Sequence, residues 1–325
     1  MDVSRSNVAE QGVPEQSLTA NPRLLHIVVM MVGVVFAFLV SIAGGPAAVW
    51  GKSAGMSSPQ GNSRVSAVFS EPDLDRQGPQ KQAEILLERA VSRSDGARDQ
   101  IGNQAQTEAQ IEARVEGWRG KLAWNSQLGD LTTVALNSSD ESVRASAIEV
   151  QLAAYGLPKS ESSVEALVRQ ATSRDHAKKI WAMWALGLLG NRGIETDRVV
   201  HVLSAHLKDS GKNFDRDEDT RCWAVEGLAL VGTTPTIAPL LEVMHNDPSP
   251  LVRERAASRL AESSMLSHEQ RLIAVPQLID YSADPALDAQ THALVFQALA
   301  DITRQRLPND SAVWRNWYQT RGPEN

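Results

Sequence analysis

Apolar side chains recur at helical spacing along most of the chain after residue 79. Between residues 79 and 122 they fall on one face of each of two successive segments, which predicts two N-terminal helices. The first segment carries Ile85, Leu86, Ala90 and Val91 on that face. A polar turn near residues 94–96 separates it from the second segment.

A longer pattern repeats between residues 123 and 304. Five segments begin with a short polar residue, and four positions later each carries a basic residue or a histidine. The segments start at Asp140, Asp175, Asp217, Ser249 and Asp288, so successive starts lie 35, 42, 32 and 39 residues apart. Each segment follows another helical stretch, at 128–137, 163–172, 197–207, 236–245 and 268–281. The unit is therefore a helix pair, and pairs must stack because one pair cannot bury its own apolar face.

This repeat resembles the HEAT-repeat family of armadillo-like α-solenoids. The residues that carry the resemblance are Asp140, Val143, Arg144 and Ala147, and the segment from Asp217 has the same spacing. The resemblance implies an all-α fold in which about five helix pairs form a right-handed α-solenoid over residues 123–304. We interpret the recurring aspartates and arginines as a structural ladder of charge and capping hydrogen bonds between pairs.

The C-terminal residues 305–325 contain one more short amphipathic segment. Trp314, Trp317 and Tyr318 lie on one face of it, and Asp310 or Ser311 can cap its N-terminus. We expect a capping helix and tail that cover the last apolar face of the stack. A ligand site built on these aromatic residues is the alternative.

The most apolar stretch, residues 24–43, precedes the repeats. Its twenty residues, at ~1.5 Å of rise each, reach about 30 Å, the thickness of the hydrocarbon layer. It predicts a single-pass transmembrane helix or signal anchor after an N-terminal tail, residues 1–23. Small residues follow it, so a cleaved signal peptide, and hence an exported soluble protein, is the alternative.

Residues 44–78 are rich in Gly, Ser, Pro and Gln, which predicts a flexible linker between the membrane and the helices. The basic residues near the apolar stretch are too evenly distributed to set its orientation. A short tail followed by one apolar segment and a large domain favours a membrane protein whose soluble part lies outside the cytoplasm.

Composition narrows the classes of protein further. The net charge of −7 argues against a nucleic-acid binder, and a single cysteine, Cys222, excludes a disulfide framework. The acidic stretch from Asp215 to Glu226 imitates a calcium loop but lacks its central glycine. No phosphate-binding loop, GxSxG or HExxH motif is present, so we predict no catalytic residue, no cofactor and no metal.

The candidate site lies on the second helices of the pairs, which line the concave face of HEAT solenoids. One side of each second helix carries the apolar residues that form the core. Positions on the opposite side are mostly polar in the first, fourth and fifth pairs, but several are large and apolar in the second and third. These residues, with one carboxylate, form what we call the tryptophan face: Trp181, Trp184, Leu188, Trp223, Glu226 and Leu230.

We expect the tryptophan face to bind a protein partner, because clustered exposed tryptophans mark interaction sites. Burial of these side chains by solenoid curvature or by the helices of 79–122 is the alternative. If the face binds a partner, replacing Trp181 and Trp223 with alanine abolishes binding and leaves the melting temperature almost unchanged.

The sequence thus predicts a membrane-tethered scaffold that is not an enzyme. The alternative class is a HEAT-like DNA glycosylase, in which Trp181, Trp223 and Glu226 would supply the aromatic residues and the carboxylate. That activity requires a basic groove for phosphates, which the acidic net charge and the membrane anchor oppose.

Overall fold

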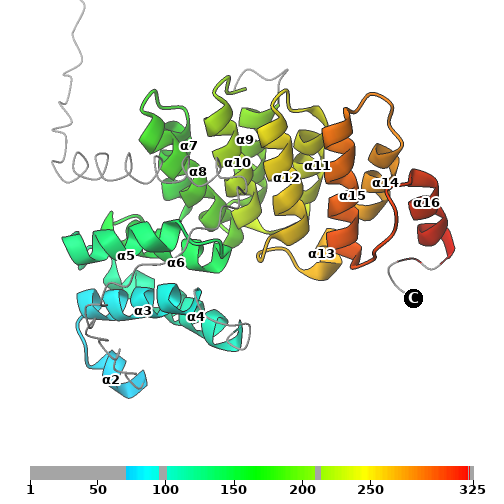
Figure 1. Cartoon of the computed structure of the whole chain (residues 1–325). Helices are drawn as coiled ribbons and strands as arrows, with labels where there is room; N and C mark the ends of the chain where they lie inside the picture. Colours follow the sequence, from blue (N-terminus) through cyan, green and yellow to red (C-terminus); the bar gives the residue numbers. More distant parts are fainter. Residues whose placement is uncertain (1–70, 95–100, 209–213, 321, 323–325) are drawn as a thin grey trace, which may run out of the picture.

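The computed structural model describes residues 71–94, 101–208, 214–320 and 322. Within these ranges the protein is all-helical and contains no strand, so the prediction of an all-α fold is confirmed (Figure 1). The N-terminal tail, the apolar stretch 24–43 and most of the expected linker lie outside the described residues. Among the residues that the structure describes, none of the helices combines the length and apolarity that a membrane crossing requires.

The helices follow one another through short connections. In chain order they are α2 (Glu71–Asp75), α3 (Pro79–Ser94), α4 (Ile101–Trp118), α5 (Ser126–Leu136), α6 (Glu141–Ala154), α7 (Glu161–Ala171), α8 (His176–Asn191), α9 (Thr196–Leu207), α10 (Glu218–Val231), the 3₁₀ turn η2 (Thr234–Thr236), α11 (Ile237–Asn246), α12 (Pro250–Glu262), α13 (His268–Leu272), α14 (Val275–Ser282), α15 (Ala289–Thr303) and α16 (Ser311–Thr320).

The polar residues that start the repeat are the N-caps of its second helices. Each side chain accepts a hydrogen bond from a backbone N–H in the first turn, which satisfies a group that the helix itself leaves free. These caps are Asp140 on α6, Asp175 on α8, Asp217 on α10, Ser249 on α12 and Asp288 on α15.

Consecutive helices pack in pairs, and the pairs from α7 onward stand in a row (Figure 1). The pairs are α5 with α6, α7 with α8, α9 with α10, α11 with α12, and α14 with α15. Their second helices contact one another in the order α6, α8, α10, α12, α15. In Figure 1, α3–α6 run crosswise to the upright helices from α7 onward, and α3 and α4 pack on α5 and α6.

Two elements differ from the sequence-based expectation. The stretch 268–281, expected as one helix, is two short helices, α13 and α14. Pro276 stands in the first turn of α14, where its missing N–H is harmless, whereas it would break the interior of a longer helix. The short helix α2 lies in the stretch 44–78, where we expected only a linker, and its Leu74 is fully buried.

Helices α8 and α10 meet at glycines. A Cβ atom on Gly187 would overlap the carbonyl oxygen of Gly227, and one on Gly227 would lie 2.8 Å from the carbonyl oxygen of Met183. Only residues without a side chain permit this approach, so the two backbones pack directly against each other.

A contact between residues far apart in the sequence joins α6 to the end of α12. The Oε2 atom of Glu141, in the first turn of α6, accepts hydrogen bonds from Ser263 Oγ at 2.6 Å and from the Ser264 backbone N–H at 2.7 Å. We call this the α6–α12 contact. It links two residues that are 123 positions apart and so holds the crosswise helices against the row of pairs.

Candidate functional site

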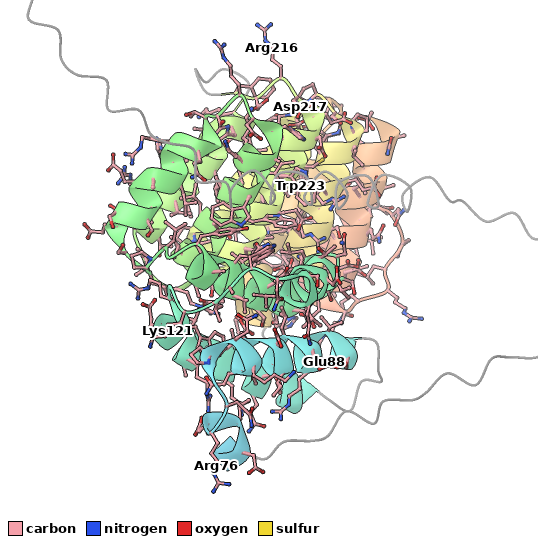
Figure 2. All side chains as sticks on the ribbon, turned by 90° about the vertical axis from the view of Figure 1, so that its left-hand side faces the viewer. Arg76, Glu88, Lys121, Arg216, Asp217 and Trp223 are labelled. Atoms are coloured by element: carbon pink, nitrogen blue, oxygen red, sulfur yellow. The ribbon has the colours of Figure 1, made fainter. Side chains whose placement is uncertain are left out.

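All six residues of the tryptophan face are buried. Trp181 and Trp223 are each 7% exposed, and the other four are between 0% and 4% exposed. In Figure 2 Trp223 lies midway down the stack, below Asp217 at its upper end. The six side chains are therefore buried, which is the alternative that the sequence left open. They do not form an exposed surface.

Side chains of α6 and of its C-cap residue, Tyr155, account for part of this burial. Trp181 Nε1 donates a hydrogen bond to Gln151 Oε1 at 3.0 Å, and the Trp181 ring packs edge-on against Tyr155 with 5.0 Å between ring centroids. On the other side, Trp184 packs edge-on against Trp223 at 4.8 Å. These contacts connect α6 to α8 and α8 to α10, so the tryptophans act as packing residues of the stack.

Glu226, the one carboxylate of the tryptophan face, is enclosed by arginines. Its Oε1 atom accepts hydrogen bonds from Arg255 Nη1 at 2.7 Å and Arg259 Nε at 2.9 Å. Arg144 Nη2 lies 3.5 Å from its Oε2 atom. Burial opposes ionisation, but the three guanidinium groups outweigh it and hold the pKa of Glu226 below its ordinary value.

Glu141 completes this arrangement, which we call the Glu226 cluster: Glu141, Arg144, Glu226, Arg255 and Arg259. The Oε1 atom of Glu141 lies 3.5 Å from Arg144 Nη2 and 3.4 Å from Arg259 Nη1. Residues of α6, α10 and α12 thus meet in one ionic cluster. Because Glu226 is only 3% exposed and is bound to arginines, it is not available to a substrate or partner.

A second set of ionic contacts joins successive pairs. Arg221 Nε and Nη2 bind the two carboxylate oxygens of Asp247 at 2.9 and 3.0 Å. Arg253 Nη2 binds Asp288 at 2.8 Å, and Lys179 Nζ binds Asp215 at 2.6 Å. Each basic residue comes from the first turn of a second helix and reaches a carboxylate that precedes the next second helix. Three of the recurring basic residues therefore form joints between pairs, at the steps from α8 to α10, from α10 to α12 and from α12 to α15.

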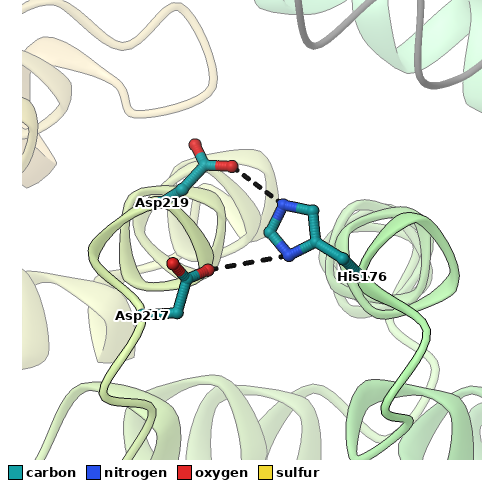
Figure 3. A group of neighbouring side chains, drawn as sticks. All are labelled: His176, Asp217 and Asp219. Atoms are coloured by element: carbon teal, nitrogen blue, oxygen red, sulfur yellow. Dashed lines mark hydrogen bonds and ion pairs between the residues drawn. The ribbon is translucent and has the colours of Figure 1, made fainter.

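Among the described residues, His176, Asp217 and Asp219 lie close enough together to be considered as metal ligands (Figure 3). The Nε2 atom of His176 is 2.9 Å from Asp219 Oδ2, and its Nδ1 atom is 3.6 Å from Asp217 Oδ2. One ion can bind only one ring nitrogen, and Asp217 Oδ2 already accepts two hydrogen bonds from Thr220. The geometry is that of a histidine between two carboxylates.

Cys222 has the surroundings of an unreactive thiol. It is 6% exposed, and burial raises its pKa to about 12. A thiol with such a pKa carries almost no thiolate at neutral pH, which excludes it as a nucleophile.

A hollow of about 170 Å³ lies between α12 and α15, on the same side of the second helices as the polar positions noted in the sequence. We call it the acidic hollow. Its lining comprises Glu254, Ala257, Ser258, Ala261, Glu262, Leu294, Gln297, Ala298 and Asp301. The sequence predicted a polar face at this place. It could not predict the hollow, because the space above the small side chains depends on how α12 and α15 pack.

The comparisons with known proteins give no family. No protein-family model matches the chain, and no curated protein matches it. Among solved structures it is similar to the crystal structure of an engineered protein, a Northeast Structural Genomics Consortium target. The identity is 18%, over 71% of this chain and 94% of that chain, with a TM-score of 0.30. The residues described above therefore carry the functional inference.

Proposed function

We propose that the protein is a non-catalytic HEAT-repeat scaffold that a membrane anchor at residues 24–43 tethers to a bilayer. In this proposal residues 123–304 form a right-handed α-solenoid of about five helix pairs, which displays a protein-binding surface. The observation that carries the proposal is the series of ionic joints at Lys179, Arg221 and Arg253. The joint recurs at three of the four steps between pairs, and such contacts suit a stacked-repeat scaffold, since each repeat is stabilised by its neighbours.

The binding surface is the part of the second-helix face that stays open. The tryptophan face on α8 and α10 is buried, whereas Glu262, Gln297 and Asp301 on α12 and α15 are exposed. The partner therefore contacts the C-terminal half of the row, and nucleic acid is disfavoured because this surface is acidic.

The anchor is tested by fractionation of the full-length chain. We expect it in the membrane fraction after an alkaline carbonate wash, and we expect a chain without residues 24–43 in the soluble fraction. Recovery of the full-length chain in the soluble fraction contradicts the anchor. A pair of C-terminal reporters, one active only outside the cytoplasm and one fluorescent only inside, tests the proposed exported orientation.

The scaffold function is tested by crosslinking in the cells that make the protein. A photoreactive amino acid replaces Gln297, which is exposed on α15, or Val134, which is 53% exposed on α5 and serves as the control. We expect a discrete protein adduct from position 297 and none from position 134. Absence of a discrete adduct at position 297, or an identical pattern from both positions, contradicts a partner at this face.

A further inference from the structure

The acidic hollow combines an apolar floor with a charged rim. The floor consists of small or aliphatic side chains: Ala257, Ala261, Leu294 and Ala298. The rim carries the exposed carboxylates Glu254, Glu262 and Asp301. No lysine or arginine stands among the described residues that line it. The hollow thus offers negative charge above a surface suited to methylene groups.

The register of the helices brings two of these carboxylates to equivalent places. Glu262 lies thirteen residues after the N-cap of α12, and Asp301 lies thirteen residues after the N-cap of α15. Since α12 and α15 pack side by side, like charges recur on neighbouring helices, and none of the lining residues is cationic. Arg259 interacts electrostatically with Glu262, but its guanidinium group is bound to Glu226. Such an arrangement repels itself and favours any cation that can enter.

We propose that the acidic hollow binds an arginine side chain of the protein partner. A guanidinium group is planar, stays charged and can pair with carboxylates through several N–H groups. Its aliphatic stem packs on apolar surface while the charged end reaches the rim. The proposal rests on the proposed function, because the arginine belongs to the partner that this face binds.

The size and chemistry of the hollow favour this occupant over others. At about 170 Å³ it is smaller than the pockets of roughly 300–1,000 Å³ that take drug-sized ligands, and it suits one long side chain. A calcium ion requires six to eight oxygen ligands around it, which a floor of alanines does not supply.

The test uses the full chain in lipid nanodiscs with isotope-labelled alanine methyl groups. The probe is the peptide acetyl-Gly-Arg-Gly-amide, and the matched neutral probe carries citrulline in place of arginine. We expect the arginine peptide to shift the methyl signals of Ala257, Ala261 and Ala298 in a saturable manner, whereas the citrulline peptide leaves them unchanged. Equal shifts from both peptides, or none from either, overturn the proposal.

Two double variants separate the hollow from general electrostatic attraction. E262Q/D301N removes two rim charges, and we expect roughly three- to tenfold weaker binding of the arginine peptide. E242Q/D280N makes the same change of charge at exposed residues of α11 and α14, the first helices of the same two pairs, and is expected to bind like the original chain. Equal affinity in E262Q/D301N and E242Q/D280N overturns the proposal.

The crosslink from position 297 distinguishes failure of this inference from failure of the scaffold function. We expect the adduct to be lost in E262Q/D301N and kept in E242Q/D280N. An adduct that persists in E262Q/D301N refutes the arginine contact while the scaffold function stands. If the arginine peptide binds but position 297 gives no adduct, two claims are refuted. No partner binds this face, and the arginine does not belong to a partner.

Discussion

Glu226 shows how strongly the role of one side chain depends on what surrounds it. In the sequence it lies on the helix face opposite the core, among large apolar residues. This position suggested that its carboxylate binds a partner. In the structure it contacts Arg255 and Arg259 within hydrogen-bond distance, with Arg144 nearby, and it is buried. Its charge therefore compensates the charge of the arginines. Loss of this charge is expected to lower the stability of the fold rather than to weaken binding of a partner directly.

Replacing Glu226 with glutamine keeps the shape but removes the charge. The three guanidinium groups are then left with one carboxylate of the Glu226 cluster, Glu141, which contacts only Arg144 and Arg259. We expect the free energy of unfolding to fall by about 3 kcal/mol, as when one partner of a buried ion pair is removed. Urea denaturation measures this loss. The control Glu242→Gln, at an exposed carboxylate of α11, should change stability by less than about 0.5 kcal/mol, and equal stability of the two variants would refute the role of the cluster.

The same carboxylate predicts a dependence of stability on pH. The pKa of Glu226 is lower in the folded chain than its ordinary value, so its contribution is fully present above the unfolded pKa of about 4.3. The contribution is lost as the pH falls through the folded pKa. We expect the stability difference between the original chain and Glu226→Gln to shrink from pH 6 toward pH 3. A difference that stays constant over this range would show that Glu226 does not titrate in this way.

Burial also reverses the expected effect of the tryptophan substitutions. Trp181 and Trp223 are 7% exposed, and truncating a buried tryptophan to alanine costs about 3–5 kcal/mol. We therefore expect Trp181→Ala with Trp223→Ala to lower the melting temperature strongly, whereas the exposed control Val134→Ala leaves it almost unchanged. Calorimetry of the full chain measures the effect. An unchanged melting temperature would contradict the packing role and would support the hypothesis that the tryptophan face binds a partner.

The second helices could be located from the sequence because their start signals are local. An aspartate or serine that caps a helix acts on the next two or three residues, and a basic residue in the first turn follows at fixed spacing. The break between α13 and α14 also had a local signal, Pro276, but the apolar spacing of 268–281 masked it. The close approach of α8 and α10 had no such signal, because Gly187 and Gly227 show their use only when the two helices are side by side.

The glycine contact gives a prediction about this pair of helices. Gly187→Ala places a methyl group against the backbone of Gly227 and should destabilise the chain by about 1–3 kcal/mol, as overpacking does. The control is Gly117→Ala in α4, where a Cβ atom meets nothing within 4 Å. There we expect no loss and a gain of up to about 1 kcal/mol, because alanine favours a helix. Thermal unfolding compares the two, and a loss of equal size in both would refute the close contact.

The tertiary arrangement explains why the candidate site could be predicted only in part. The helical wheel identified the residues of the tryptophan face, but the burial of Trp181 involves Gln151 of the crosswise helix α6 and Tyr155 at its C-terminal end. Helix α6 is held in turn by its packing on α4, α5 and α8 and by the α6–α12 contact, between residues 123 positions apart. Local periodicity holds no information about such a contact, and for the same reason the acidic hollow could not be seen in the sequence.

The α6–α12 contact also determines how the chain should respond to mechanical force. We expect tension applied to the two ends to pass through Glu141 and Ser264 and to bypass the helices between them while this contact holds. Its rupture would then release about 123 residues, a gain in contour length of roughly 400 Å. In optical tweezers we expect one large extension step, and in Glu141→Ala a series of small steps as pairs unravel in turn. Small steps in the original chain would mean that the contact bears no load.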